Sequence, residues 1–273
     1  MRLLKQLVPA ALVAAAGGAA VQAVGGDPYL TLVLGVATAA LALFVYARTV
    51  RWSEGRAPDE VAVAGAVAAT GRGMLIGAGM FAAVILNIAF VGGYRVDGMG
   101  SVTGAVAMVG FMAAAAVTEE VLFRGILFRI VEERIGTLLA LVLTGVLFGL
   151  MHLFNAHATL WGAIAIAIEA GGMLAAAYAA TRTLWLPIGL HFGWNFAAAG
   201  IFATEVSGSG ASEGLLNGVT SGPALLTGGE FGPEASPYAV VFGLLLTAVF
   251  LWLARRRGNL VPLRRRATAT LSR

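Results

Sequence analysis

Long uncharged stretches of apolar residues recur along almost the whole chain. A transmembrane helix needs about 20 mostly apolar residues, and on this scale the sequence predicts eight spans. They lie at residues 7–25, 29–47, 74–93, 103–127, 137–155, 159–180, 184–203 and 238–254. The segment 58–73 is too short and too mixed to span, and we expect an interfacial or elbow helix there. The pattern therefore predicts an all-α, polytopic membrane helix bundle of about eight transmembrane helices, forming a single integral membrane domain over residues 1–273.

The composition supports a membrane protein. Of the 273 residues, 59% are apolar and 12% are charged, whereas a typical soluble domain is about 25% charged. Cysteine is absent, which excludes disulfide bonds, thiolate metal sites and cysteine nucleophiles. With a single lysine and many Ala and Gly residues, the composition suggests a GC-rich bacterial gene. We therefore expect the protein in a bacterial cell membrane.

The basic residues predict an orientation, because Lys and Arg gather in cytoplasmic loops. They precede the first span and follow every even-numbered span, whereas the loop 204–237 has neither Lys nor Arg. Both termini are thus predicted to be cytoplasmic, with Arg95 the main exception. Seven arginines lie in 255–273. We interpret this segment as a basic cytoplasmic tail that anchors the orientation, and not as a site for nucleic acid or a specific lipid.

Residues 1–23 also fit a second interpretation. A basic start, an apolar centre and small residues near 21–23 are typical of a signal peptide. We favour a retained helix, and cleavage would leave the remaining topology unchanged.

The fourth predicted span carries the first cluster of ionisable residues, each of which costs roughly 2.5–3.5 kcal/mol at membrane depth. Glu120 and Arg124 are four residues apart, so they share a helix face and can pair. Glu119 is rotated by about 100° from that face and has no partner at that spacing. An unpaired carboxylate is suited to act as a general base. The charged run 132–134 is interpreted instead as solvated at the membrane edge.

Two further clusters contain histidine. His152 lies near the end of the fifth span, with Phe148 one turn earlier. His191 and Asn195 lie four residues apart in the seventh span, so two hydrogen-bond donors share a face and can hold an oxyanion. A hydrogen-bonded core histidine and an interhelical polar clasp remain alternatives. His157 is predicted to be a loop residue.

Taken together, the three clusters supply a base, a second acid–base group and oxyanion donors, as hydrolysis of an amide by an activated water requires. They also match a divalent-metal site formed by Glu119, His152 and His191, so a metal such as zinc is a candidate cofactor. Two other classes stay open: a proton-coupled transporter, against which the lack of an internal repeat counts, and a non-catalytic immunity or scaffold protein. Glu169, in the sixth span, is a further buried carboxylate that either lines the same cavity or bonds a neighbouring helix.

Three motifs occur in order on separate spans, within a predicted catalytic core at about 105–200. They are Glu119-Glu120-x-x-x-Arg124, Phe148-x-x-x-His152 and His191-x-x-x-Asn195. The series resembles the signature of the CPBP family of intramembrane proteases, which includes the eukaryotic CAAX prenyl endopeptidase and the bacterial Abi proteins. The stretch 184–195 is especially similar to the bacterial form. Residues 181–183 depart from the Arg-Thr-Gly-Ser that relatives often have.

The resemblance implies an intramembrane endopeptidase that cuts a prenylated, peptide or membrane-anchored protein substrate, with the lipid bilayer as its other partner and no nucleic acid. By the same resemblance Glu119 would activate the water with help from His152. His191 and Asn195 would stabilise the oxyanion.

The resemblance also implies that Arg124 and Glu120 orient the site. The family is compatible both with a metal-dependent mechanism and with a metal-free glutamate mechanism. The sequence leaves this choice open.

Overall fold

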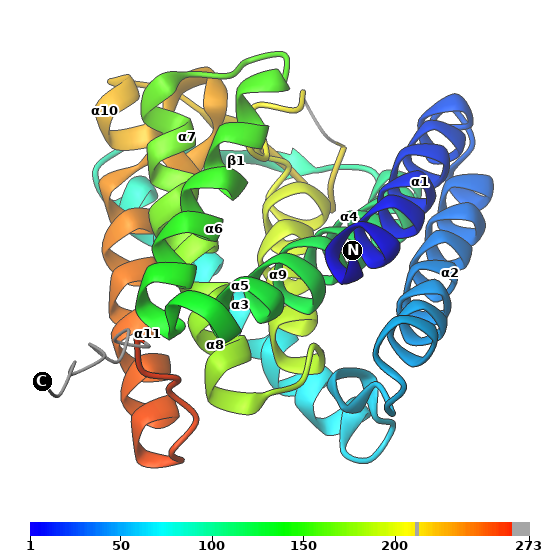
Figure 1. Ribbon diagram of the computed structural model, residues 1–273. Coiled ribbons are helices and arrows are strands. Elements are labelled where there is room, and N and C mark those ends of the chain that lie inside the picture. The colour runs from blue at the N-terminus through cyan, green and yellow to red at the C-terminus, as the bar shows by residue number, and fades with distance from the viewer. Residues whose placement is uncertain (211–212, 264–273) are drawn as a thin grey trace, which may run out of the picture.

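Helices carry most of the chain in the computed structural model, which describes residues 1–210 and 213–263 (Figure 1). The long helices without a π-helical turn are α1 (Arg2–Ala23), α2 (Pro28–Glu54), α3 (Ala66–Phe90), α6 (Thr137–Met151) and α11 (Pro237–Arg256), and α4 (Val102–Glu120) begins one of the others. Capping residues mark several starts. The Asp27 side chain accepts hydrogen bonds from two amides of the first turn of α2, and the Ser101 hydroxyl accepts one from the first turn of α4.

Three further helices contain a π-helical turn. α4 continues through η2 (Val121–Phe128) into α5 (Arg129–Ile135). α7 (Leu160–Ile166) continues through η4 (Ala167–Gly172) into α8 (Met173–Thr181), and α9 (Trp185–Phe196) ends in η5 (Ala197–Ile201). The short elements are η1 (Asp59–Val61), η3 (His152–Phe154), α10 (Ala224–Thr227), η6 (Gly229–Phe231) and η7 (Pro233–Ala235). Strands β1 (Tyr94–Met99) and β2 (Leu216–Thr220) form one antiparallel pair.

Seven helices in the described part of the chain are long and apolar enough to cross a membrane. The fold is thus the predicted polytopic all-α bundle, but the span predicted at 184–203 is not among the seven. It has twelve residues of α-helix and five of π-helix. At about 1.5 Å per residue this is shorter than the hydrocarbon layer of roughly 30 Å. A helix enclosed by other helices does not need that length.

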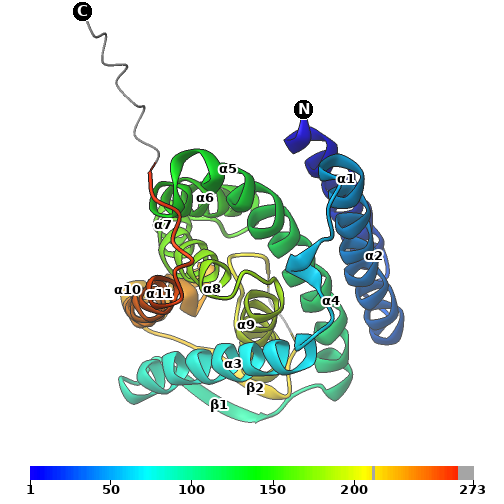
Figure 2. The same ribbon diagram turned by 60° about the horizontal axis from the view of Figure 1, so that its bottom comes forward.

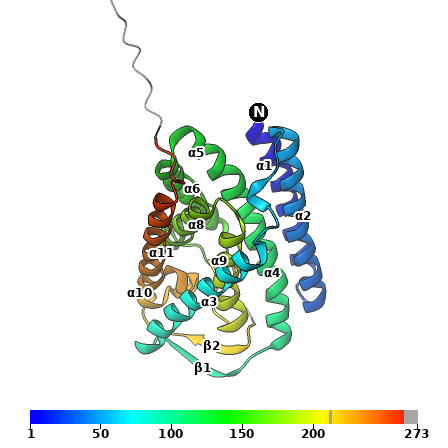
Figure 3. The ribbon, with the colours of Figure 1, turned by 90° about the horizontal axis from the view of Figure 1, so that it is seen from below.

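The α9–η5 helix nevertheless runs from one end of the bundle to the other. The Leu184 amide bonds the Glu60 carbonyl at its start, and the Leu215 amide bonds the Gly200 carbonyl at its far end. Figure 3 shows the N-terminus, α5 and the end of α11 at one end of the bundle and β1–β2 at the other. Odd-numbered spans therefore leave at the strand end, as the predicted alternation requires. The cytoplasmic orientation stays a prediction, and residues 264–273 lie outside the described residues.

The prediction for 58–73 is partly wrong. Only η1 is a separate short helix, and residues 66–73 already belong to α3. Gly65 precedes α3 in a left-handed conformation, with φ 74°. The helix therefore begins about two turns before the apolar run that marked its position in the sequence.

The centre of the bundle is α9, surrounded by α3, α4 and α8 (Figure 2). Glycines bring α3 and α9 into backbone contact, as small residues do between membrane helices. A Cβ added to Gly77 would lie 2.1 Å from the Leu190 carbonyl oxygen, and one added to Gly189 would lie 2.1 Å from the Thr70 carbonyl oxygen. Gly193 meets α3 in the same way.

Candidate active site

A buried chain of charged groups joins α4, η2 and α9. One carboxylate oxygen of Glu120, Oε1, accepts a hydrogen bond from Arg124 Nη1 at 2.7 Å and lies 2.9 Å from His191 Nδ1. All three residues are buried. The predicted pairing of Glu120 with Arg124 is confirmed, and His191 joins it from a helix 71 residues away in sequence.

The Arg124 guanidinium also binds the π-helical turn of the sixth predicted span. Its Nη2 donates to the Ala170 carbonyl at 2.8 Å and to the Gly171 carbonyl at 3.4 Å. The guanidinium carbon lies 4.6 Å from the centre of the Phe148 ring, a cation–π distance. Single π-helical turns are frequent at functional sites, and here η2 supplies the arginine while η4 supplies its acceptors.

Glu119 is the accessible carboxylate of this cluster. Its Oε2 is a buried oxygen that lies 3.9 Å from His191 Nε2 and has no hydrogen-bond partner among the described residues. The side chain is 34% exposed. It lines a groove of about 270 Å³ between α1, α2 and α4, whose other lining residues are mostly apolar. The base candidate can thus be reached from the apolar side of the bundle.

The sequence of α9 explains why its polar groups face the site. Gly189 and Gly193 are four residues apart and face α3. His191 and Asn195 are also four apart but offset by two residues, which is about 200° around the helix. The glycine face therefore fixes α9 against α3 and directs the histidine and the asparagine away from it.

His152, His191 and Asn195 line one small cavity of about 20 Å³. His152 lies in η3, where its Nδ1 is 2.8 Å from the Phe148 carbonyl oxygen. The centre of the Phe148 ring lies 4.9 Å from that of the His152 ring and 6.2 Å from that of the His191 ring. Glu119 does not line this cavity but the groove, and Glu120 and Arg124 line neither of the two.

Glu234 lines the same cavity and was not predicted as a site residue. Its Oε1 accepts from Trp194 Nε1 at 2.7 Å, and its Oε2 accepts from the Ser207 amide at 2.5 Å and from the Ser207 hydroxyl at 2.8 Å. Burial raises the pKa of the Glu234 carboxyl. The sequence gives one signal for Glu234, an acidic residue in a loop without Lys or Arg. It does not reveal the partner Trp194 on α9, which is 40 residues away.

The interpretation of 132–134 as a solvated run is wrong for Glu132. Its carboxylate is 2% exposed and accepts from Arg182 Nη1 at 2.5 Å and from the Thr137 hydroxyl at 2.5 Å. Arg182 has a left-handed φ of 57°. It is one of the residues 181–183 that depart from the family pattern. His157 is an exposed loop residue, as predicted.

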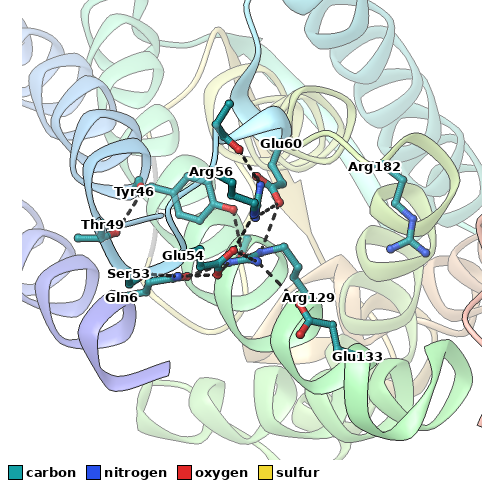
Figure 4. Close-up of polar contacts among 12 residues, drawn as sticks. Gln6, Tyr46, Thr49, Ser53, Glu54, Arg56, Glu60, Arg129, Glu133 and Arg182 are labelled. Carbon is teal, nitrogen blue, oxygen red and sulfur yellow. Dashed lines mark hydrogen bonds and ion pairs between the residues drawn. The ribbon is translucent and has the colours of Figure 1, made fainter. Parts of the chain in front are cut away.

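A second polar cluster connects η2 to the N-terminal helices α1 and α2 (Figure 4). The Gly125 carbonyl accepts from Arg129 Nε at 2.8 Å and from the Tyr46 hydroxyl at 3.1 Å. Arg129 also donates to both oxygens of Glu54, at 2.8 and 3.0 Å, and to Gln6 at 2.8 Å. Because Gly125 follows Arg124 directly, α1 and α2 fix the turn that carries the buried arginine.

The donors present do not fit a metal ion in this arrangement. Within residues 1–210 and 213–263, no three or more His, Asp or Glu side chains are grouped so as to hold one. Of the predicted trio, His191 Nε2 faces Glu119, whereas His152 lines a cavity that Glu119 does not line.

Comparison with known proteins agrees with the motifs. Residues 101–197 match the family model described as Rce1-like, type II CAAX prenyl endopeptidase Rce1-like. No curated protein and no solved structure matches the chain. The matched segment contains all six predicted site residues and ends before Glu234. The resemblance stated from the sequence is confirmed, because the segment that carries the predicted site residues is similar to the Rce1-like family of type II CAAX prenyl endopeptidases.

Proposed function

We propose that this protein is an intramembrane endopeptidase in which Glu119 activates a water molecule. The observation that carries the proposal is the contrast within the charged cluster. Glu120, Arg124 and His191 hold one another at 2.7 and 2.9 Å. Glu119 has a free oxygen, borders the groove and faces His191 Nε2 at 3.9 Å.

In the proposed reaction, Glu119 takes a proton from water while the water oxygen attacks the carbonyl carbon of the scissile peptide bond. The C–N bond then breaks and Glu119 delivers the proton to the leaving nitrogen. A general base of this kind contributes typically 10²–10⁴-fold to the rate. His152 assists and His191 and Asn195 stabilise the oxyanion in this proposal.

The groove supports a substrate held at the membrane. Ala14, Gly18 and Val21 of α1 line it together with Phe111 and Leu122 on the α4–η2 helix. Such a lining suits a lipid-like or apolar chain, because apolar surface is stabilised by contact with apolar surface. We therefore propose a prenylated or membrane-anchored peptide as the substrate class.

The test is cleavage by purified protein in detergent micelles of a short peptide ending in a prenylated cysteine segment, and of the same peptide without the prenyl group. Glu119→Gln should lower kcat/KM by at least ~100-fold, the lower limit for loss of a general base. Glu133→Gln is the matched control, because Glu133 is an exposed carboxylate at the end of α5. Equal cleavage by wild type and Glu119→Gln would contradict the proposal.

A further inference from the structure

Glu169 has a carboxyl group that the proposed mechanism does not use. The residue is 1% exposed in the π-helical turn η4. Neither carboxyl oxygen has a hydrogen-bond partner among the described residues. The side chain lines the 20 Å³ cavity that His152, His191 and Asn195 also line. An interhelical hydrogen bond, the alternative reading of Glu169 from the sequence, is not formed within the described part of the chain.

The side chain is held in this direction. The next carbonyl along the chain, that of Ala170, accepts the hydrogen bond from Arg124. On the opposite side, α11 packs so closely that a Cβ added to Gly243 would lie 2.5 Å from Glu169 Cβ. Glu169 is thus fixed between the buried arginine and α11, and its carboxyl group faces the cavity.

A buried polar group without a partner costs roughly 1–3 kcal/mol or more, so the cavity must offer Glu169 a hydrogen-bond donor. A cavity needs about 10–15 Å³ to hold one water, and the water needs two to four polar partners. This cavity measures about 20 Å³ and is also lined by His152, Asn195, Ser207 and Glu234. Its size and lining fit a single water molecule.

We propose that Glu169 holds a water molecule in this cavity, and that the site supplies the water consumed at the Glu119–His191 centre. The second half rests on the proposed function. Each turnover adds the hydroxyl of one water to the acyl carbon and one proton to the leaving nitrogen, so the centre needs a new water every cycle. His191 lines the cavity and also faces Glu119, which places the stored water one side chain from the reaction.

The first test needs no cleavage activity. Hydroxyl radicals generated by X-rays from water inside the protein label methionines beside that water. Met173 is 3% exposed and lines the cavity, whereas Met112 is 4% exposed and does not. In full-length wild type we expect rapid labelling of Met173 and little labelling of Met112. Glu169→Leu should remove most of the Met173 labelling, and Glu169→Gln, whose amide can still bind water, should keep it.

The second test is kinetic and uses the peptide of the cleavage assay. Glu169→Leu should lower kcat by roughly tenfold or more with little change in KM, as expected when substrate binding is intact, and Glu169→Gln should restore most of it. Unchanged Met173 labelling in Glu169→Leu would overturn the water site even if cleavage is found. Labelling as expected, with no cleavage by wild type, would leave the water site standing and contradict only the proposed function. If Glu169→Leu does not fold, unlabelled Met173 in wild type overturns the site.

Discussion

Glu119 and Glu120 are neighbours in the chain, but only Glu120 is held by other charged groups at hydrogen-bond distance. Glu120 is fully buried and shares Oε1 between Arg124 and His191. Glu119 borders the groove, and its Oε2 lies 3.9 Å from His191 Nε2. We therefore expect Glu120 to contribute mainly to stability, whereas Glu119 is free for the proposed reaction.

Substituting Glu120 should destabilise the protein much more than substituting Glu119. Glu120→Ala leaves Arg124 buried without its carboxylate, and breaking a buried pair costs about 3–5 kcal/mol. Glu119→Gln breaks no hydrogen bond of the described residues, so the free energy of unfolding should change by less than about 1 kcal/mol while cleavage is lost. Unfolding in detergent micelles, followed by circular dichroism, measures the free energy of unfolding of each variant. Similar destabilisation by both substitutions would contradict this expectation.

Arg129 should matter as much for stability as Glu120, although it lies about one turn beyond the site. Arg129→Met leaves the 7%-exposed Glu54 side chain with fewer donors and should cost about 3–5 kcal/mol. Tyr46→Phe removes only the hydrogen bond to Gly125 and should cost about 0.5–1.5 kcal/mol. Arg134→Met, at an exposed position of the same helix, is the control and should be neutral. Equal stability of the Arg129 and Arg134 variants would exclude this function of the cluster.

Arg182→Gly should have two opposing effects on stability, a gain from the relaxed backbone and a loss from the broken ion pair. Glycine relieves the left-handed conformation, worth roughly 1–2 kcal/mol. The substitution also removes the cation from the buried Glu132, which costs about 1–3 kcal/mol and more for a charged group. We expect a net loss of stability, and recovery when Glu132→Gln is added. A more stable single variant would show that backbone strain outweighs the pair.

Glu234 should give stability a pH dependence. Burial raises the pKa of its carboxyl above the ordinary 4.5, so the unfolded chain ionises this group first as the pH rises. The contribution of Glu234 to the free energy of unfolding is therefore largest below pH 4.5. It declines as the pH rises toward the folded pKa and is constant above it.

The measurement is the melting temperature of wild type and Glu234→Gln at a series of pH values. Subtracting the variant removes the contribution of groups common to both proteins, including His152 and Glu169, which line the same cavity as Glu234. The wild-type melting temperature should fall relative to the variant as the pH rises from 4.5. A constant difference would contradict the prediction.

Local spacing was enough to predict part of this site. Four-residue separation placed Glu120 with Arg124 and Asn195 with His191, because both pairs lie in regular α-helix or at its junction with a π-helical turn. The same reasoning located most of the long helices, since an apolar run of membrane length has few other structures open to it. The positions of the helix ends were less certain, as α3 shows.

Contacts between distant segments could not be predicted. Glu132 was predicted to be solvated at the membrane edge, yet it pairs with Arg182, which is 50 residues away in sequence. Glu234 reaches Trp194 from a loop without periodicity. The three π-helical turns were missed because an apolar period of 3.6 residues does not reveal one wider turn.

The glycine contact between α3 and α9 also decides where the molecule can open. Backbone atoms meet at Gly77 and Gly189 with no space between them, so α9 cannot roll or separate on that side without losing the contact entirely. Across the site, α1 has few buried side chains and borders the groove beside Glu119. We therefore expect a substrate to enter beside α1, while α9 stays still and α2 stays packed on α4, where a Cβ added to Gly35 would lie 2.1 Å from the Gly110 carbonyl oxygen.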